Sequence, residues 1–412
     1  MKLLHLADLH LGRLFHEQSL IEDQRYLLNQ ILELLSQEPH NALILAGDIY
    51  DRSIPSAEAV TLFSFFLHSL HNRFPNLAIC IIPGNHDSPD RLAFGHELFR
   101  TMNIHIISDP NQSFEPIVLG NGNERCAIFL LPFLYPGSLE PTGSGLHANQ
   151  KDTLTVETHT AEPKGLRTQQ ELVAEACRRL ESQRKALESE GISQSVLVAH
   201  LFTLGGMETD SERIFIGTAE QVDAKLFAGF TYVALGHLHR QQQVSSNAWY
   251  AGSPLAYSFG EAEQEKACLS VELAGNPAGA TVRTIPLKPL HPVRRITGAF
   301  ADLMGKPRGE LVNSYLEVEL SDEHLVENAQ RLLEQRYPLV LSVKQDRGFQ
   351  ALLQERAAIQ GALPEPAHRE GGRRRSPLDD FKAFEETLYG SVDQEKLDLF
   401  TSLLEESSHE TP

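Results

Sequence analysis

Five short apolar segments, each followed or ended by potential metal ligands, constrain the fold of this chain more than any other feature of its sequence. The first is LLHLADLHLG, residues 3–12, in which Asp8 and His10 follow an apolar run. Residues two apart on a strand point to the same side, so both side chains should leave the strand end together. The candidates at the ends of the other four segments are Asp48, then Asn85 and His86, then His200, and finally His237 and His239.

Amphipathic helices separate several of these segments. Apolar periodicity predicts helices over residues 19–37, 56–74 and 168–188, while a Gly- and Pro-rich stretch over 136–170 predicts a long surface loop. Short apolar strands that alternate with longer helices predict an α/β fold whose sheet is covered on both faces. In such sheets ligands gather at the carboxyl ends of the strands, which is where the candidate residues lie.

The chain is predicted to have four parts. Residues 1–287 carry the five segments and end in edge strands. Residues 288–350 contain a strand, a helix predicted over 321–336 with a capping residue at its start, and another strand, which together indicate a small α+β domain. Residues 351–375 include a run rich in Pro, Gly and Arg and predict a linker, and residues 376–412 predict a helical tail.

The tail carries its own start and stop signals. Ser376 and Pro377 predict the start of a first helix and Gly390 its end, while Ser391 and Gln394 form a candidate capping box for a second helix. An apolar stripe on the first helix comprises Leu378, Phe381, Phe384 and Leu388. About thirty residues cannot bury a core of their own. We therefore expect the tail to dock on another protein, with packing on the chain's own body as the alternative.

The strand-end side chains offer oxygen and imidazole nitrogen but no sulfur. The four cysteines lie far apart without a CxxC pair, which predicts reduced thiols in the cytoplasm rather than a disulfide framework or a zinc knot. Such a donor set suits Mn²⁺, Fe²⁺ or Zn²⁺ and exceeds the four ligands of one zinc ion. It is enough for two ions about 3.5–4 Å apart, bridged by Asp48, which can activate a water and stabilise both oxygens of a phosphoester displacement.

The motifs DLHLG, GDIYD, GNHD, AH and GHLH resemble, in order and spacing, those of the calcineurin-like metallophosphoesterases. HLFTLGG, YVALGHLHR and YAGSPLAYSFGE narrow the resemblance to the nuclease-subunit family of bacterial SbcCD complexes, which belongs to the double-strand-break repair nucleases. The likeness covers residues 1–285 well and the smaller domain only in general layout. It implies a four-layer α/β/β/α sandwich, a small α+β capping domain and a C-terminal helical tail.

The resemblance also implies roles for single residues. One metal ion would be bound by Asp8, His10, Asp48 and His239. The other would be bound by Asp48, Asn85, His200 and His237, and both ions would be Mn²⁺. His86 would stabilise charge or protonate the leaving oxygen, with Asp87 orienting it. Asp51 stands where some relatives carry a second histidine, so its role stays open.

The implied function is DNA phosphodiester hydrolysis, both 3′–5′ exonuclease and endonuclease, in DNA end and hairpin processing. The implied partner is an SbcC-type coiled-coil ATPase, bound by a homodimer of this chain in a heterotetramer. The formal net charge of −19 is unusual for a DNA-binding protein, so contact with DNA should depend on bound metals or on the partner. We expect no membrane span and no signal peptide, because no apolar run reaches about 18 residues and no basic n-region precedes one.

Three alternatives remain open on the sequence alone. A phosphatase or a small-molecule phosphodiesterase would need the same metal centre, although it would need neither the capping domain nor the tail. A non-catalytic scaffold could keep the fold in order to assemble with the ATPase. The arginines in GRRR, residues 372–375, are predicted to lie in a solvated linker, with DNA contact as the alternative.

Overall fold

The computed structural model describes residues 1–139, 166–207, 209, 221–274, 279–305, 309–345 and 377–409. The chain forms two compact units, Met1–Arg294 and Arg295–Pro412. The domain limits predicted from the sequence, at 287 and 350, stay predictions. The linker over 351–375 and most of the surface loop predicted over 136–170 lie outside the described residues.

The first unit contains a six-stranded sheet in the order β16-β15-β1-β4-β5-β6. Its strands are β1 (Lys2–Leu6), β4 (Ala42–Ala46), β5 (Ala78–Ile82), β6 (Ile104–Ile106), β15 (Ala267–Ala274) and β16 (Gly279–Pro286). The first four are parallel, while β15 pairs antiparallel with both β1 and β16. We expected edge strands at the end of this unit, but only β16 lies at an edge, because β15 hydrogen-bonds on both of its sides.

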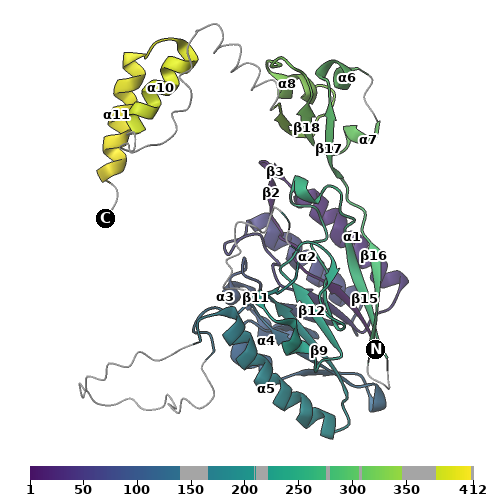
Figure 1. Ribbon diagram of the computed structural model, residues 1–412. Coiled ribbons are helices and arrows are strands. Elements are labelled where there is room, and N and C mark those ends of the chain that lie inside the picture. Colours follow the sequence, from purple (N-terminus) through teal and green to yellow (C-terminus); the bar gives the residue numbers. More distant parts are fainter. Residues whose placement is uncertain are drawn as a thin grey trace, which may run out of the picture. The chain divides into compact units, whose positions relative to one another are not determined.

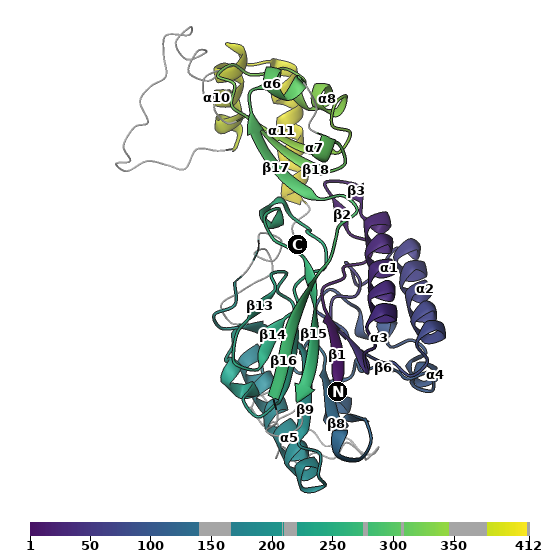
Figure 2. The same ribbon diagram turned by 90° about the vertical axis from the view of Figure 1, so that its right-hand side faces the viewer.

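Helices α1 (Ile21–Gln37) and α2 (Ala57–Arg73) confirm the first two predicted helices. They connect β1 to β4 and β4 to β5, and they lie beside each other on the outer side of this sheet (Figure 1; Figure 2). Ser56 caps α2 by accepting a hydrogen bond from the backbone N–H of Ala59. The two helices bury apolar stripes of the kind that their periodicity predicted.

A second six-stranded sheet has the order β13-β14-β12-β9-β8-β7. Its strands are β7 (Ile117–Leu119), β8 (Cys126–Leu131), β9 (Gln194–His200), β12 (Tyr232–Gly236), β13 (Gln242–Gln243) and β14 (Ala248–Tyr250). The predicted third helix is α5 (Gln169–Ser189), which precedes β9 and begins with a capping box formed by Thr168 and Glu171.

The two sheets pack face to face. One buried cluster joins Ile44 and Cys80 of the first sheet to Val198 and Tyr232 of the second, and a separate cluster packs α5 against the outer face of the second sheet. The order of layers is therefore α1 and α2, first sheet, second sheet, α5, which confirms the predicted four-layer α/β/β/α sandwich. The four cysteines are buried in this unit and form no disulfide, also as predicted.

Several short elements connect the layers. They are β2 (Leu14–Phe15), β3 (Gln18–Ser19), α3 (Pro89–Leu92), α4 (His96–Arg100), β10 (Phe202–Thr203) and β11 (Gln221–Val222), together with 3₁₀ helices η1 (Pro110–Phe114), η2 (Gly122–Glu124), η4 (Ala224–Phe227) and η5 (Phe259–Glu261).

The second unit contains a three-stranded sheet in the order β17-β18-β19, formed by β17 (Val293–Gly298), β18 (Tyr315–Leu320) and β19 (Val340–Lys344). Its helices are α6 (Phe300–Met304), α7 (Gly309–Val312) and α8 (Ala329–Glu334). The helix that we predicted over 321–336 is wrong at its start, because α8 begins only at Ala329, after Asn328 in the left-handed region. Leu333 and Tyr337 pack this segment against Leu316 of β18.

The tail forms two helices, α10 (Pro377–Tyr389) and α11 (Gln394–His409). Gly390 has a positive φ and its N–H bonds to Glu386, which confirms the predicted helix end, whereas Ser376 lies outside the described residues. The predicted capping box is wrong, since α11 starts only at Gln394 and the Gln394 side chain donates to Asp398 instead. None of the helices in the described ranges has the length and hydropathy that a membrane crossing requires.

Candidate metal centre

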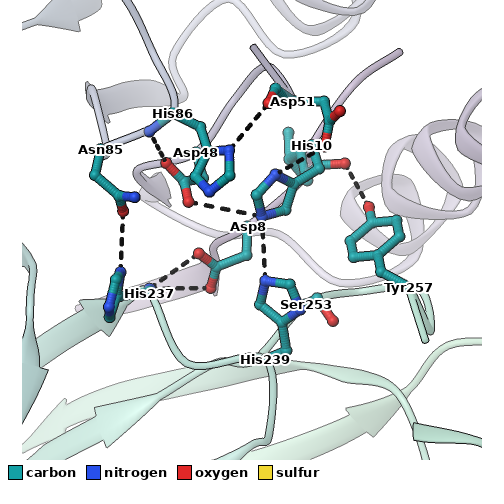
Figure 3. A network of polar contacts seen from close by, with 12 residues as sticks. Asp8, His10, Asp48, Asp51, Asn85, His86, His237, His239, Ser253 and Tyr257 are labelled. Atoms are coloured by element: carbon teal, nitrogen blue, oxygen red, sulfur yellow. Dashed lines mark hydrogen bonds and ion pairs between the residues drawn. The ribbon is translucent and has the colours of Figure 1, made fainter. Parts of the chain in front are cut away.

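The candidate ligands come together where the carboxyl ends of the parallel strands of both sheets meet. Figure 3 shows Asp8, Asp48 and Asn85, from loops after β1, β4 and β5, opposite His237 and His239, from the loop after β12. His200 is the last residue of β9 in the second sheet. The strand ends that we predicted from five separate segments therefore form one cluster, and all seven candidate ligands are described residues.

The backbone at several ligands is strained. Asp8, His10, Asp48 and His237 have positive φ angles of 55°, 42°, 49° and 107°, which non-glycine residues seldom adopt. Such strain persists only where surrounding contacts hold it, and here the N–H of Asp8 bonds to Gly47 and that of His10 bonds to Asp48. The chain thus turns away from each strand sharply enough to point the ligand side chains inward.

The close approach of the two sheets depends on a glycine. A Cβ on Gly236, the last residue of β12, would collide with the carbonyl oxygen of Ala46 at the end of β4 and would crowd the His200 ring. The glycine in the GHLH motif therefore has a packing reason: it lets a strand end of the second sheet lie against a strand end of the first. This contact determines how closely the donors of the second sheet approach those of the first.

One half of the centre is formed by Asp8, His10, Asp48 and His239. The Nε2 atoms of His10 and His239 lie 3.1 Å apart, and the His10 Nε2 lies 3.6 Å from Asp48 Oδ2. One ligand atom each of Asp8, His10 and His239 lies within 4.8 Å of the others. These four side chains are buried, so a cation among them would lose most of its water shell and would need donors of this kind.

The other half is formed by Asn85, His200 and His237 together with Asp48. The Oδ1 atom of Asn85 lies 3.1 Å from His200 Nε2 and 3.0 Å from His237 Nδ1. Asp48 Oδ2 lies 3.4 Å from His200 Nε2, so the same oxygen faces a histidine in each half. Asp48 thus occupies the position that a bridging carboxylate requires.

The electrostatics of the cluster favour bound cations. The pKa of Asp8 is raised to about 7, chiefly by burial; His200 and His239 lower it in part, and Asp48 adds to the rise. Burial also raises the pKa of Asp48, but His200, His10 and His86 outweigh it and hold the pKa well below its usual range. Despite its burial, His200 has a pKa raised to about 9 by Asp48 and Asp8. The negative charge of buried carboxylates is costly unless it is neutralised. Protons on these carboxylates and on neighbouring histidines neutralise it in the metal-free protein, and bound divalent cations can do so instead.

His86 lies beside the first half of the cluster. Its ring is edge-on to that of His10, with 4.8 Å between centroids, and its Nδ1 lies 3.0 Å from the carbonyl oxygen of Asp51. That Asp87 orients His86 stays a prediction. The Asp87 carboxylate accepts hydrogen bonds from the backbone N–H groups of Ile49, Tyr50 and Gly84. Asp87 therefore ties together the loops that carry Asp48 and Asn85.

Sequence reasoning missed two charged pairs behind the histidines. Arg13 pairs with Asp51, whose role was left open, and Lys266 pairs with the buried Glu261. Glu261 is the last residue of the motif YAGSPLAYSFGE. The available signal was a carboxylate within an apolar motif with a lysine five residues later. Such a pair does not reveal its partners until the fold is known.

The donor set fits a pair of divalent ions. Its carboxylate and imidazole atoms converge in three overlapping groups, which are Asp8/His10/His239, His10/Asp48/His86 and Asp8/Asp48/His200, and no thiol belongs to any of them. Carboxylates, an amide and imidazoles arranged in this way suit metal-assisted hydrolysis of a phosphate ester.

Family comparisons agree with this chemistry. The calcineurin-like phosphoesterase family model matches residues 1–241, and a model described as the type 5 capsule protein repressor C-terminal domain matches residues 289–387.

Two curated relatives are named as the SbcD component of the nuclease SbcCD. The chain is 32% identical over 346 residues to the protein from Staphylococcus saprophyticus, covering 83% of this chain and 84% of that one. It is 31% identical to the protein from Staphylococcus epidermidis, covering 83% and 85%. Among solved structures, a dimetal phosphatase from Danio rerio matches with a TM-score of 0.39 and 12% identity, over 69% of this chain and 98% of that chain.

Proposed function

The chain belongs to the calcineurin-like phosphoesterases and, within them, to the SbcD family of SbcCD nuclease components, and from this premise we propose its activity. It is a metal-dependent phosphodiesterase of the nuclease type. We propose that it acts on DNA as a 3′–5′ exonuclease and an endonuclease, in end and hairpin processing during repair, recombination and replication. The observation that carries the proposal is the convergence of seven oxygen and nitrogen donors from two sheets on one cluster, in which six of the side chains are buried and Asn85 is partly exposed.

We propose the following assignment of ligands. Asp8, His10, Asp48 and His239 would bind one ion, and Asp48, Asn85, His200 and His237 would bind the other, with Mn²⁺ as the ion. When bound, such a pair supplies an activated water and neutralises charge on a phosphate. The chain's own part is to fix the donors. The N–H of His237 donates to Asp8 at 2.9 Å, and the N–H of His86 donates to Asp48 at 2.9 Å, so each carboxylate is held by a loop from another segment.

His86 would serve the leaving oxygen. Its Nδ1 faces the carbonyl of Asp51, an acceptor that favours a proton on Nδ1 and leaves Nε2 as the atom that exchanges a proton with the substrate. Protonation of the departing sugar oxygen by an imidazolium contributes typically 10²–10⁴-fold in rate. Asp87 would support this step only indirectly, by holding the loops on either side.

An activity comparison tests the proposal against the small-molecule alternative. The purified chain would be assayed on linear duplex DNA labelled at the 5′ end, on circular single-stranded DNA, and on bis-p-nitrophenyl phosphate, in Mn²⁺, Mg²⁺ or a chelator, with and without the ATPase. We expect Mn²⁺-dependent shortening from the 3′ end and cutting of the circle. Rapid hydrolysis of the small diester with no cutting of DNA under any condition would favour the alternative, and inactivity on all substrates with every metal would favour the scaffold.

We also propose that the tail binds an SbcC-type coiled-coil ATPase. Phe381 and Phe400 stack with ring centroids 4.2 Å apart, so part of the predicted stripe holds the two helices together. Phe384 and Leu399, by contrast, are 55% and 62% exposed. Amphipathic helices commonly bind helical grooves through such side chains. Leu388, the other residue that we expected to matter, has no described side chain.

The exposed pair therefore provides the sharper test of partner binding. Phe384→Ala with Leu399→Ala should weaken co-purification with the ATPase while the helical content and metal content stay unchanged. Phe381→Ala is the matched comparison, because it should loosen the helix pair and lower its thermal stability. Binding at full strength by the Phe384/Leu399 variant would refute this docking surface.

A homodimer within a heterotetramer is our proposal for the assembly. Large apolar side chains that are exposed between residues 54 and 102 support it, with Phe94 85% and Leu98 72% exposed. Phe94→Glu with Leu98→Glu should give a monomer in analytical ultracentrifugation.

The cytoplasm is the proposed location, since both DNA and the ATPase would be reached there. Contact of the arginines at 372–375 with DNA stays a prediction, and these residues lie outside the described ones.

A further inference from the structure

A buried ion pair lies directly behind His239. The Glu261 carboxylate is fully buried, and its Oε1 lies 3.7 Å from His239 Nδ1. Its other oxygen, Oε2, accepts from Lys266 Nζ at 2.6 Å. The ring nitrogen that faces Glu261 is the one opposite Nε2, the atom that points to His10. A carboxylate at this position fixes the tautomer and the orientation of a metal-binding imidazole.

Lys266 also ties this pair to the loop that carries His239. Its Nζ donates to the carbonyl oxygen of His239 at 3.0 Å and to Ser253 Oγ at 2.9 Å. Glu261 additionally accepts from Ser258 Oγ at 2.9 Å. Both charges are therefore satisfied, and together they hold the backbone and the ring of one histidine.

A second pair lies behind His10. Asp51 Oδ1 lies 3.5 Å from His10 Nδ1 and accepts from the Arg13 guanidinium at 2.9 Å. The His10 Nδ1 atom is buried and has no hydrogen bond within the usual distance, so Asp51 is the group placed to accept a hydrogen bond from its N–H. Arg13 in turn lies over the Tyr257 ring, 5.1 Å from its centroid. The arrangement of cation, carboxylate and imidazole repeats that behind His239.

The remaining two histidines lack this arrangement. His200 Nδ1 lies 2.9 Å from the backbone carbonyl oxygen of Ala46, a neutral acceptor within hydrogen-bond distance, while the carboxylate oxygen at 3.9 Å belongs to Asp8, which is itself a proposed metal ligand. His237 presents Nδ1 itself to Asn85, at 3.0 Å, so this nitrogen is its candidate ligand atom. Among the described residues, the carboxylate–cation pairs that back a candidate ligand therefore lie behind His10 and His239.

We propose that two carboxylate–cation pairs, Asp51 with Arg13 and Glu261 with Lys266, are positioning pairs for the metal position at His10 and His239. They make this position bind its ion more tightly than the position at His200 and His237, which exchanges its ion more easily. The inference rests on the proposed metal ligands and goes beyond them by ranking the two positions. An ionised acceptor behind an imidazole increases its donor strength more than a peptide carbonyl does, and loss of such partners typically costs 10–100-fold in metal affinity.

A Co²⁺ titration measures this ranking without relying on activity. The metal-free protein would be titrated while visible absorption and heat are followed, and a His237→Ala background would leave the His10/His239 position to be measured alone. Wild type should bind two ions in separable steps. Glu261→Gln and Asp51→Asn should each weaken the tighter step by about 10–100-fold and leave the weaker step within about threefold.

Two controls separate positioning from folding. Glu38→Gln is the matched control, since Glu38 also pairs with a lysine and an arginine, Lys2 and Arg283, and should leave both steps unchanged. Glu261→Gln with Lys266→Met removes both buried charges, so it should keep the metal-free melting temperature closer to wild type than Glu261→Gln alone and still show the weaker tight step. Rescue by Glu261→Asp should be partial.

The outcomes distinguish this inference from the proposed function. Two tight steps in wild type that are unaffected by Glu261→Gln and Asp51→Asn would overturn the ranking while leaving the two-metal nuclease intact. Equal weakening of both steps would also overturn it, since the effect would then be general. A wild-type protein that binds fewer than two ions would overturn the two-metal assignment itself, and the ranking with it.

Discussion

The two sheets of the sandwich contribute different chemistry to one site. The first sheet supplies the oxygen donors among the seven proposed ligands, Asp8, Asp48 and Asn85, together with His10. The second sheet supplies only imidazoles, and these are His200, His237 and His239. Neither sheet alone has the donors for two divalent ions, so the centre exists only where the sheets pack together. The packing of the two sheets, and not a single loop, therefore creates the site.

The two sheets also differ in the charges that they bring to the site. The carboxylates of the first sheet hold His200 of the second protonated, with a pKa raised to about 9 despite burial. The pKa of His237 is lowered to about 3, chiefly by burial and next by the charge of His200. The two imidazoles therefore differ in charge because Asp48 and Asp8 outweigh burial at His200, whereas burial and the charge of His200 prevail at His237.

Loss of the shared carboxylate should have the largest effect. Asp48 lies within 3.6 Å of His10 and 3.4 Å of His200, one histidine from each sheet. Asp48→Ala should lose both ions and reduce nuclease activity below detection, because both halves lose their common donor. Metal analysis after dialysis, together with the DNA assay, measures both quantities. A variant that keeps two ions per chain and wild-type activity would refute the bridging role.

His86→Ala should have the next largest effect. The residue belongs to the first sheet's loops but is proposed to act on the leaving oxygen, so the variant should lose about 10²–10⁴-fold in kcat. Both ions should remain bound, as in wild type. His68→Ala, on the outer helix α2, is a control that should change neither quantity. Loss of an ion from the His86 variant would make His86 a ligand and its proposed role wrong.

The smallest effect is a pH dependence of stability in the metal-free protein. The pKa of His200 is raised from 6.5 to about 9 on folding, so its contribution is fully present below pH 6.5 and is lost as pH rises through 9. Asp8 and Asp87, with pKa values raised to about 7, change stability in the same direction below that pH. The free energy of unfolding should fall by up to about 3 kcal/mol between pH 6.5 and 9.

Chemical denaturation in a chelator measures this dependence. His10 and His237 have pKa values lowered from 6.5 to about 4 and about 3, so each makes the folded protein more stable as pH rises to somewhat above 6.5. They therefore oppose the change only at the lower end of this window and contribute nothing further above about pH 7.5. His200→Gln should flatten the curve between pH 7.5 and 9. A metal-free wild-type protein that becomes more stable over that range would show that the carboxylates of the first sheet do not protonate His200.

Sequence reasoning was most successful where the signal was local. The strand ends at Asp8, Asp48 and His200 were predicted because each closes a short apolar run, and α1 and α2 because their apolar periodicity extends over several turns. Their convergence followed from the general rule that ligands gather at the carboxyl ends of parallel strands. The face-to-face packing of two sheets came from the family resemblance, since periodicity alone indicates only that strands are buried.

Sequence reasoning was least successful where contacts between residues distant in the sequence decide the structure. The helix predicted from Ser321 begins at Ala329, where Leu333 can pack against β18. The three backbone N–H groups that donate to Asp87 come from two loops, and its place beside His86 in the sequence gave no sign of them. The partner of Glu261 across the site, His239, lies 22 residues earlier in the sequence, and no spacing rule links them.

Anomalous diffraction from crystals grown with Mn²⁺ tests the central claim most directly. The account predicts two anomalous peaks about 3.5–4 Å apart, one beside His10 and His239 and the other beside His200 and His237, with Asp48 contacting both. A single peak, or two peaks bound by residues of only one sheet, would contradict the claim that the two sheets together build a two-metal centre.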